Sequence, residues 1–492
     1  MPLTMQGQTG SSRGWILAIT AVVLVALVLR WRAFSPFDIS HADELMQYLE
    51  QAKRIATGQG IVPWEYRYGA RNGGIAQILS VPWLLGERFA PGTLGAMLLA
   101  RWSFVLLTLL ALPAAWKLGA LTGRAQALIA LLVAAVWYES VLFSTLLLSE
   151  VLATGLIACA LPLLLADERR AGALRWAGLL LGLGVVVRLQ FAPFAAVVAL
   201  LTLRTDRKAW GQLVLGGLGA AVIGGLSDLA MGRWPFEWVW VNFSYNIGES
   251  RAARFGENGP FDYFTWLAVH LGPGAPLIVA AALAVPARYR PVLWALAANI
   301  VFHSLITHKE YRFIWLSTFL LLVMAAIGSV GLLERLRAAR GTKVGPAQLV
   351  LLGAGWIVLS VTAEQMSGGA GAMRGGGPIP RVVQDHVRAG SACGIALPDQ
   401  WRAHLVPALL PRQAPLYIAP EGVIARGERL PRDLAAAANT LVFEDRPVGA
   451  GDYVQVKCES NGPVKACLYV RQGACTPAPQ WSYQSALERE DL

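Results

Sequence analysis

The sequence predicts an all-α polytopic membrane protein with about 11 transmembrane helices, followed by a small C-terminal α/β domain. Three observations lead to this fold class. Only 15% of the 492 residues are charged and 55% are hydrophobic, whereas soluble domains carry about 25% charged residues. Long apolar runs alternate with short polar connectors over the first three quarters of the chain. The last quarter is polar and holds four of the five cysteines.

The apolar runs define the expected spans. A membrane-crossing helix needs about 20 mainly apolar residues, and we expect such helices near 15–29, 94–117, 125–138, 142–166, 172–188, 190–203, 209–230, 264–286, 291–306, 313–333 and 346–364. The first run lacks a small-residue cleavage site, so it predicts an uncleaved span and not a signal peptide. The stretch 75–90 contains Pro82 and Trp83 and predicts an interfacial or re-entrant segment.

Charge sets the expected orientation. With the N-terminus in the cytoplasm, the short basic connectors fall on the cytoplasmic side, as the positive-inside rule requires. The C-terminal segment then lies outside, where its four cysteines can form two disulfides in any of three connectivities. The prediction is a multi-pass protein of the inner (plasma) membrane. The four cysteines of its C-terminal segment are Cys393, Cys458, Cys467 and Cys475.

The domain organisation follows from these boundaries. We expect a transmembrane domain at 1–366 with a first extracytoplasmic loop at about 35–92, a flexible Gly-rich linker at 367–380, and a soluble extracytoplasmic domain at 381–492. In the last domain, strands are expected at 394–397, 440–443, 453–458 and 466–470, the last two forming a hairpin, with helices at 381–388 and 431–438. We find no catalytic pattern there.

The net charge of +11 does not indicate a nucleic-acid partner. The basic residues are scattered among short connectors and form no single face. The abundance of Ala, Leu, Gly and Arg is typical of a GC-rich bacterial genome. A few basic residues near the first loop break the positive-inside pattern, among them Arg30, Arg54, Arg67 and Arg71. Contact with phosphate would explain positive charge on that side.

Polar residues inside the expected spans gather in their outer halves. Such residues are costly in hydrocarbon and tend to mark function, so they favour a site at the outer leaflet over a transport path across the midplane. Glu150 and Arg188 lie at similar depth and could form an ion pair, either at the site or simply between two helices. The residues are Glu150, Arg188, Asp228, His270 and His303.

The first motif with chemistry is His41-Ala42-Asp43-Glu44, in the first outer loop. A carboxylate here could act as a general base. The structural alternative is an acidic first turn of a helix over 42–56, where negative charge suits the helix dipole. Downstream, Trp64-Glu65 and Arg71 could bind a sugar ring and a phosphate, or could belong to an interfacial aromatic belt.

The second motif is His308-Lys309-Glu310-Tyr311-Arg312-Phe313, between two apolar runs. Its cations suit a phosphodiester, with Lys as a point charge and Arg as a bidentate fork. A basic patch for anionic lipid head groups is the alternative, but such patches are commoner on the cytoplasmic side.

Together these motifs resemble glycosyltransferase family 22, the mannosyltransferases of N-glycan and GPI-anchor assembly and their bacterial relatives. The late His-Lys-Glu-x-Arg-Phe segment is the most specific element, and Arg233-Trp234-Pro235-Phe236 matches loosely. The resemblance covers roughly 15–335. It implies a GT-C fold, a polyprenyl- or dolichyl-phosphate mannose donor, an extracytoplasmic site and an inverting mechanism.

The resemblance also implies residue roles. Asp43 would be the base and Glu44 would support it or orient the acceptor. The donor phosphate would be held by His308, Lys309 and Arg312, with Arg71 as a further candidate, and the acceptor would contact Trp64 and Glu65. No metal is required, since no Asp-x-Asp nucleotide-sugar motif stands near, although a divalent ion is not excluded.

The expected partners are a polyprenyl-phosphate-linked sugar, a glycan or glycolipid acceptor and membrane lipids, with no nucleic acid. Two alternatives remain: another GT-C transferase, such as a protein mannosyltransferase or a lipid A sugar transferase, and a non-catalytic transporter of lipid-linked glycans.

Overall fold

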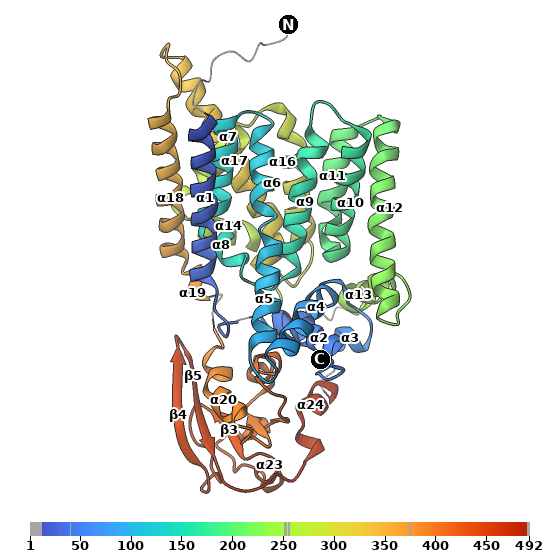
Figure 1. The fold of residues 1–492 in the computed structure, drawn as a ribbon, viewed down its shortest axis with the longest axis vertical. Helices are drawn as coiled ribbons and strands as arrows, with labels where there is room; N and C mark the ends of the chain where they lie inside the picture. The colour runs from blue at the N-terminus through green and yellow to red at the C-terminus, as the bar shows by residue number, and fades with distance from the viewer. Residues whose placement is uncertain (1–11, 40, 250–252, 254–255, 373–374, 490–492) are drawn as a thin grey trace.

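The computed structural model stacks a helical bundle on a small α/β domain, with the helices of the first loop between them (Figure 1). It describes residues 12–39, 41–249, 253, 256–372 and 375–489. The chain enters at the far end of the bundle, and the sheet lies at the opposite end (Figure 1). The first loop is therefore covered on one side by the bundle and on the other by the C-terminal domain.

Apolar helices form the bundle. Among the described residues, the helices that are long and apolar enough to cross a membrane cover Arg13–Ala33, Gly95–Ala120, Arg207–Ala230, Asp262–Leu283, Tyr311–Ala338 and Pro346–Ser367. Shorter apolar helices cover Arg124–Val136, Ser149–Leu165, Ala171–Val187 and Leu189–Leu203. Each predicted run overlaps one of these helices or α16 (Arg290–Ser304), but the run 142–166 includes residues 144–148, which are not helical.

The individual bundle helices begin and end as follows: α1 (Ser12–Ala33), α5 (Gly95–Thr108), α6 (Ala111–Ala120), α7 (Arg124–Val136), α8 (Tyr138–Phe143), α9 (Ser149–Leu165), α10 (Ala171–Val187), α11 (Ala192–Leu203), α12 (Arg207–Ala230), α14 (Asp262–Leu271), α15 (Ala275–Leu283), α17 (Trp315–Ala338) and α18 (Pro346–Ser367). Among the long apolar helices, the one that contains α17 is the most enclosed, with 72% of its most apolar stretch buried, whereas α1 buries 11%. Burial against protein thus places α17 at the centre and leaves α1 at the lipid-facing periphery.

Glycines let two bundle helices touch. A Cβ on Gly178 of α10 would lie 1.9 Å from the Leu213 carbonyl oxygen of α12, and a Cβ on Gly216 would lie 1.9 Å from that of Arg175. Any larger side chain would force the helices apart. Such close approach through small residues replaces the hydrophobic driving force that is absent between helices in lipid.

The first loop folds into short helices at the end of the bundle: η1 (Glu44–Leu49), α2 (Glu50–Thr57), α3 (Trp64–Arg67) and α4 (Gly74–Phe89). The predicted helix over 42–56 is confirmed, but its first turns are a π-helix. The stretch 75–90 is helix α4, which lies beside α2 and α3 between the bundle and the sheet (Figure 1). Helix α13 (Glu237–Phe243) and η3 (Ser244–Gly248) approach the loop from α12.

The C-terminal domain contains a five-stranded sheet of order β2-β1-β3-β5-β4. Strands β1 (Ile395–Leu397), β2 and β3 (Thr440–Phe443) are parallel, while β4 (Val454–Asn461) and β5 (Val464–Val470) form the predicted antiparallel hairpin. Strand β2 (Leu416–Ile418) escaped prediction because it has three residues and prolines near both ends. The helices of the C-terminal domain are α20 (Pro378–Arg388), α21 (Gln400–His404), α22 (Glu421–Ala425), α23 (Arg432–Ala437) and α24 (Tyr483–Arg489).

Of the three possible cysteine connectivities, the structure contains Cys393–Cys475 and Cys458–Cys467. The first disulfide joins segments 82 residues apart and the second closes the β4–β5 hairpin. Both agree with the expectation that this domain folds in an oxidising compartment.

The C-terminal domain is docked tightly on the first loop. Arg381 lies 3.1 Å from Asp38 of the loop, and the Asn461 amide donates to the same carboxylate at 3.1 Å. A Cβ on Gly377 would lie 1.9 Å from that Asp38 carboxylate. Of the predicted linker 367–380, residues 373–374 lie outside the described residues, and much of the rest belongs to α19 (Gly369–Ala372) and α20.

Candidate active site

A cavity of about 1170 Å³ opens where the first loop, the late motif and the C-terminal domain meet. Its polar wall comes from the first loop and from residues 308–312, and its apolar wall comes from bundle elements η2 (Leu189–Phe191), α11, α14 and α16. Among the residues predicted from sequence, the cavity is lined by Asp43, Trp64, Glu65, Arg71, His308, Lys309 and Arg312. Segments some 270 residues apart in sequence thus share one chamber, as the predicted topology required.

Arg312 is the electrostatic centre of this chamber. Its Nη2 donates to Asp43 Oδ2 at 2.6 Å, and its Nε donates to Glu310 Oε2 at 2.7 Å. Its Nη1 lies 3.8 Å from Glu150 Oε1, and Glu150 in turn pairs with Arg188 at 3.2 Å. The predicted Glu150–Arg188 ion pair is therefore confirmed, and it forms part of a buried network that reaches Asp43.

Gln47 joins Asp43 to Glu65, two of the acidic residues of the first loop. Its Nε2 donates to Asp43 Oδ1 at 2.9 Å and to Glu65 Oε1 at 2.7 Å, while Arg71 donates to its Oε1. Gln47 lies four residues after Asp43 in the same helical segment, so the two side chains face the same way. Sequence reasoning missed Gln47, although its helical spacing from Asp43 was the available signal.

The surroundings shift the pKa values of Asp43 and Glu65 in opposite directions. Burial alone would raise the pKa of Asp43, but the Arg312 and Arg71 guanidinium groups outweigh it and hold the pKa below its ordinary value. Burial dominates at Glu65 and raises its pKa. Asp43 is thus kept ionised, as a base must be.

The late motif offers its cations in different ways. His308 Nε2 lies 3.3 Å from Glu310 Oε1, which raises the pKa of this histidine. Lys309 is 4% exposed, and its ammonium group donates to the backbone carbonyls of Ile306 and Asn258. The lysine charge has no carboxylate among these acceptors, so it remains available to an anion in the cavity.

Glu44 occupies a different environment from Asp43 and lies outside the cavity lining. Its Oε2 accepts the Leu147 backbone N–H at 2.8 Å. Burial raises its pKa to about 7, opposed by the nearby Arg101 guanidinium and by that backbone hydrogen bond.

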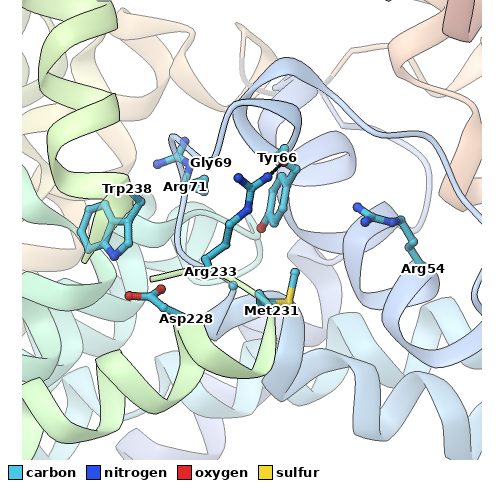
Figure 2. Close-up of a pocket in the computed structure, with 9 residues that line it drawn as sticks. Arg54, Tyr66, Gly69, Arg71, Asp228, Met231, Arg233 and Trp238 are labelled. Atoms are coloured by element: carbon cyan, nitrogen blue, oxygen red, sulfur yellow. Dashed lines mark hydrogen bonds between the residues drawn. The ribbon is translucent and has the colours of Figure 1, made fainter. Parts of the chain in front are cut away.

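A smaller cavity of about 50 Å³ lies beside Arg71 and shows how the first loop is held (Figure 2). Arg233 donates from its Nη2 to the carbonyl oxygens of Tyr66 at 2.8 Å and Arg67 at 3.1 Å. Asp228, predicted as a functional polar residue, accepts the Phe236 backbone N–H at 2.8 Å. The Arg233 contacts hold the loop segment that leads to Arg71, and the Asp228 contact fixes the turn between α12 and α13.

The expectation that Arg30 contacts phosphate is wrong. Its positive charge was expected to meet phosphate, but its guanidinium donates to the carbonyl oxygens of Ala26, Ala134 and Ala135 at 3.0 to 3.2 Å. The last two lie at the C-terminal end of α7, where orphan carbonyls favour a cation.

The described part of the chain contains no group of three or more His, Cys, Asp and Glu side chains placed to hold a metal ion.

The sequence is similar to a known protein family and to a curated protein. The model of the Alg9-like mannosyltransferase family matches residues 21–381. GPI mannosyltransferase 3 of Trypanosoma brucei brucei is 26% identical over an alignment of 368 positions that covers 63% of this chain and 64% of that protein. The chain therefore matches less than two thirds of the length of this curated relative.

The fold resembles crystal structures of ArnT from Cupriavidus metallidurans. The form bound to undecaprenyl phosphate has a TM-score of 0.55 at 13% identity, covering 95% of this chain and 100% of that one. The apo form has a TM-score of 0.50 at 16% identity, covering 83% and 86%. The shared fold is a multi-pass GT-C architecture with a small C-terminal α/β domain.

Proposed function

Because the chain belongs to the Alg9-like mannosyltransferase family, we propose that it moves a mannosyl residue from a polyprenyl-phosphate donor to an extracytoplasmic glycan or lipid-linked acceptor, with inversion. The observation that carries the proposal is the single cavity that joins the Asp43 carboxylate to the late cationic motif. One group serves the acceptor hydroxyl and the other serves a phosphate leaving group.

The proposed reaction is one displacement. The acceptor oxygen attacks the anomeric carbon from the face opposite the phosphate, the bond from that carbon to the phosphate oxygen breaks, and Asp43 takes the acceptor proton. The phosphate leaves as an anion and needs cations more than a general acid. His308, Lys309 and Arg71 are placed in the cavity lining to supply them.

Arg312 has a double role in this proposal. Without a donor it is shared among three carboxylates, of which Asp43 is the nearest at 2.6 Å. A lipid phosphate entering the cavity adds a competing anion, and part of the guanidinium charge shifts to it. The pKa of Asp43 then rises, which makes Asp43 a better base once the donor is bound.

The remaining roles follow from the placement of the side chains. Trp64 and Glu65 face the acceptor, and the apolar wall from η2, α11, α14 and α16 suits the first isoprene units of the donor. Glu44 lies outside the lining, so we assign it a structural role and not a catalytic one. The proposed step does not require a metal.

We further propose the bacterial inner membrane as the location, with about 11 spans and both the site and the C-terminal domain outside. The helices of the first loop, α2, α3 and α4, and the disulfide-containing domain lie at the same end of the bundle (Figure 1). An accessibility map of single exposed cysteines, such as Gln59→Cys and Arg340→Cys, tests this orientation. The proposal expects an external thiol reagent to label the first and not the second.

The fold likeness to ArnT supports a second candidate, another GT-C transferase that uses a different lipid-phosphate sugar. Purified protein supplied separately with polyprenyl-phosphate mannose and with other polyprenyl-phosphate sugars decides between them. Transfer from the mannose donor supports the proposal. Transfer only from another donor supports the second candidate, and no transfer from either supports a non-catalytic partner.

A further inference from the structure

The C-terminal domain contributes a tryptophan to the active-site cavity. Among the described residues that line it, Trp401 is the one that follows α20 in the chain. Its side chain is 46% exposed although it lies in a helix, α21, whose neighbouring side chains pack against the protein. A large aromatic ring exposed at the lining of a cavity is available for contact with a ligand.

Helix α21 is held rigidly, so the position of this ring is fixed. Asp399 caps the helix by accepting the Arg402 backbone N–H at 2.8 Å, and Arg402 pairs with Glu444 of the sheet domain. Ala403 and Leu405 are buried in the core shared with the first loop. The domain therefore presents Trp401 on a fixed support, as a binding surface requires.

The same helix is packed against the element that carries Asp43. His404 of α21 hydrogen-bonds to the Tyr483 hydroxyl, which lies 3.6 Å from the sulfur of Met46 in η1. Burial lowers the pKa of His404 to about 4, and the negative charge of Asp43 is among the groups that oppose this shift. The Trp401 support and the proposed base are thus parts of one packed unit.

We propose that Trp401 binds the acceptor sugar and that the C-terminal domain completes the acceptor subsite. The C–H face of a pyranose ring is apolar and can cover the indole, while its hydroxyl groups remain free to reach Glu65 and Asn242, which line the same cavity. The role deepens the proposed function and rests on it. It also explains why a transferase of this fold keeps a docked domain without a catalytic group of its own.

The test compares Trp401→Ala with Trp401→Tyr in the full-length detergent-purified protein. Steady-state transfer from polyprenyl-phosphate mannose to octyl α-mannobioside is measured, together with saturation-transfer NMR of α-mannobiose. We expect Trp401→Ala to raise the acceptor KM about tenfold and to abolish saturation transfer, with the donor KM and kcat within about twofold of wild type. Trp401→Tyr should restore most of the acceptor affinity because the flat ring is retained.

Ile424→Ala is the matched control, since Ile424 is 52% exposed in the same domain and does not line the cavity. An unchanged acceptor KM in Trp401→Ala would overturn the inference, as would a raised donor KM, which would make Trp401 a contact for the lipid. Absence of α-mannobiose binding to the wild-type protein would also contradict it. If the wild-type protein transfers sugar from none of the donors, the proposed function itself is contradicted.

Discussion

Arg312 Nη2 lies 2.6 Å from Asp43 Oδ2, and this contact joins the two motifs of the site across 269 residues of sequence. The same guanidinium also bonds both oxygens of Glu310, at 2.7 and 2.9 Å. The cation proposed for the phosphate and the carboxylate proposed as the base are therefore partners before any substrate arrives. In the proposed mechanism, this one side chain would couple donor binding to activation of the base.

Replacing Arg312 by Gln should lower both stability and activity. The change leaves Asp43, Glu310 and Glu150 without their shared cation in a buried setting, and breaking a buried pair typically costs about 3–5 kcal/mol. We expect a lower free energy of unfolding in a guanidinium titration and no detectable transfer. Arg170→Gln serves as the control, because the Arg170–Glu168 pair is 84% exposed on both sides and contributes little. If the two variants were equally stable, Arg312 would not be the electrostatic centre of the site.

The Asp43–Gln47 contact predicts a shift in the pH profile. In Gln47→Glu, a second carboxylate lies beside Asp43, and a like charge raises the pKa of a carboxyl group. Asp43 must be ionised to accept the proton, so the acid limb of kcat/KM should move to higher pH by on the order of one unit. Gln59→Glu adds the same charge at an exposed position of the same loop and should leave the profile in place. A shift of the acid limb to lower pH in Gln47→Glu would contradict the assignment.

Glu44 should make stability depend on pH. Its pKa is about 7 in the folded protein against an ordinary value of 4.5, so the folded state binds more protons than the unfolded state between these values. Stability contributed by the neutral carboxyl is then full below pH 4.5 and falls as the pH rises towards 7, by about 3 kcal/mol in all.

The variant Glu44→Gln removes this titration. The difference in melting temperature between variant and wild type should therefore favour the variant more at about pH 8 than at about pH 5, and transfer activity should persist. Thermal unfolding at both pH values measures the effect. A difference that favours the variant more at low pH, or loss of transfer without unfolding, would return Glu44 to the catalytic role that the resemblance implied.

Much of the fold could be predicted because the membrane imposes simple rules. Apolar runs in a membrane must be helices, so the apolar helices of the bundle followed from composition, and the turn residues Glu459-Ser460-Asn461-Gly462-Pro463 between two short strands predicted the β4–β5 hairpin. Topology also predicted that His41-Ala42-Asp43-Glu44 and the late motif share one face. The Asp43–Arg312 bond was not predictable, because spacing fixes which end of the bundle a residue occupies and not which side chain it meets.

Other parts of the site depend on tertiary contacts with no local signal. Arg30 looked like a phosphate ligand, yet it caps the end of α7, a role that only the packing of α1 against α7 creates. Trp401 lies in a domain without a recognisable motif and reaches the cavity only because that domain docks on the first loop. Strand β2 was too short for a periodic pattern.

The most direct test of the central claim is transfer by Asp43→Asn. The variant keeps the size of the side chain and can still accept a hydrogen bond from Arg312, so the chamber should stay intact, but it cannot take a proton. With polyprenyl-phosphate mannose and a mannoside acceptor, the proposal predicts a fall in kcat of about 10²- to 10⁴-fold with near-normal expression and donor binding. Transfer at the wild-type rate would show that Asp43 is not the base.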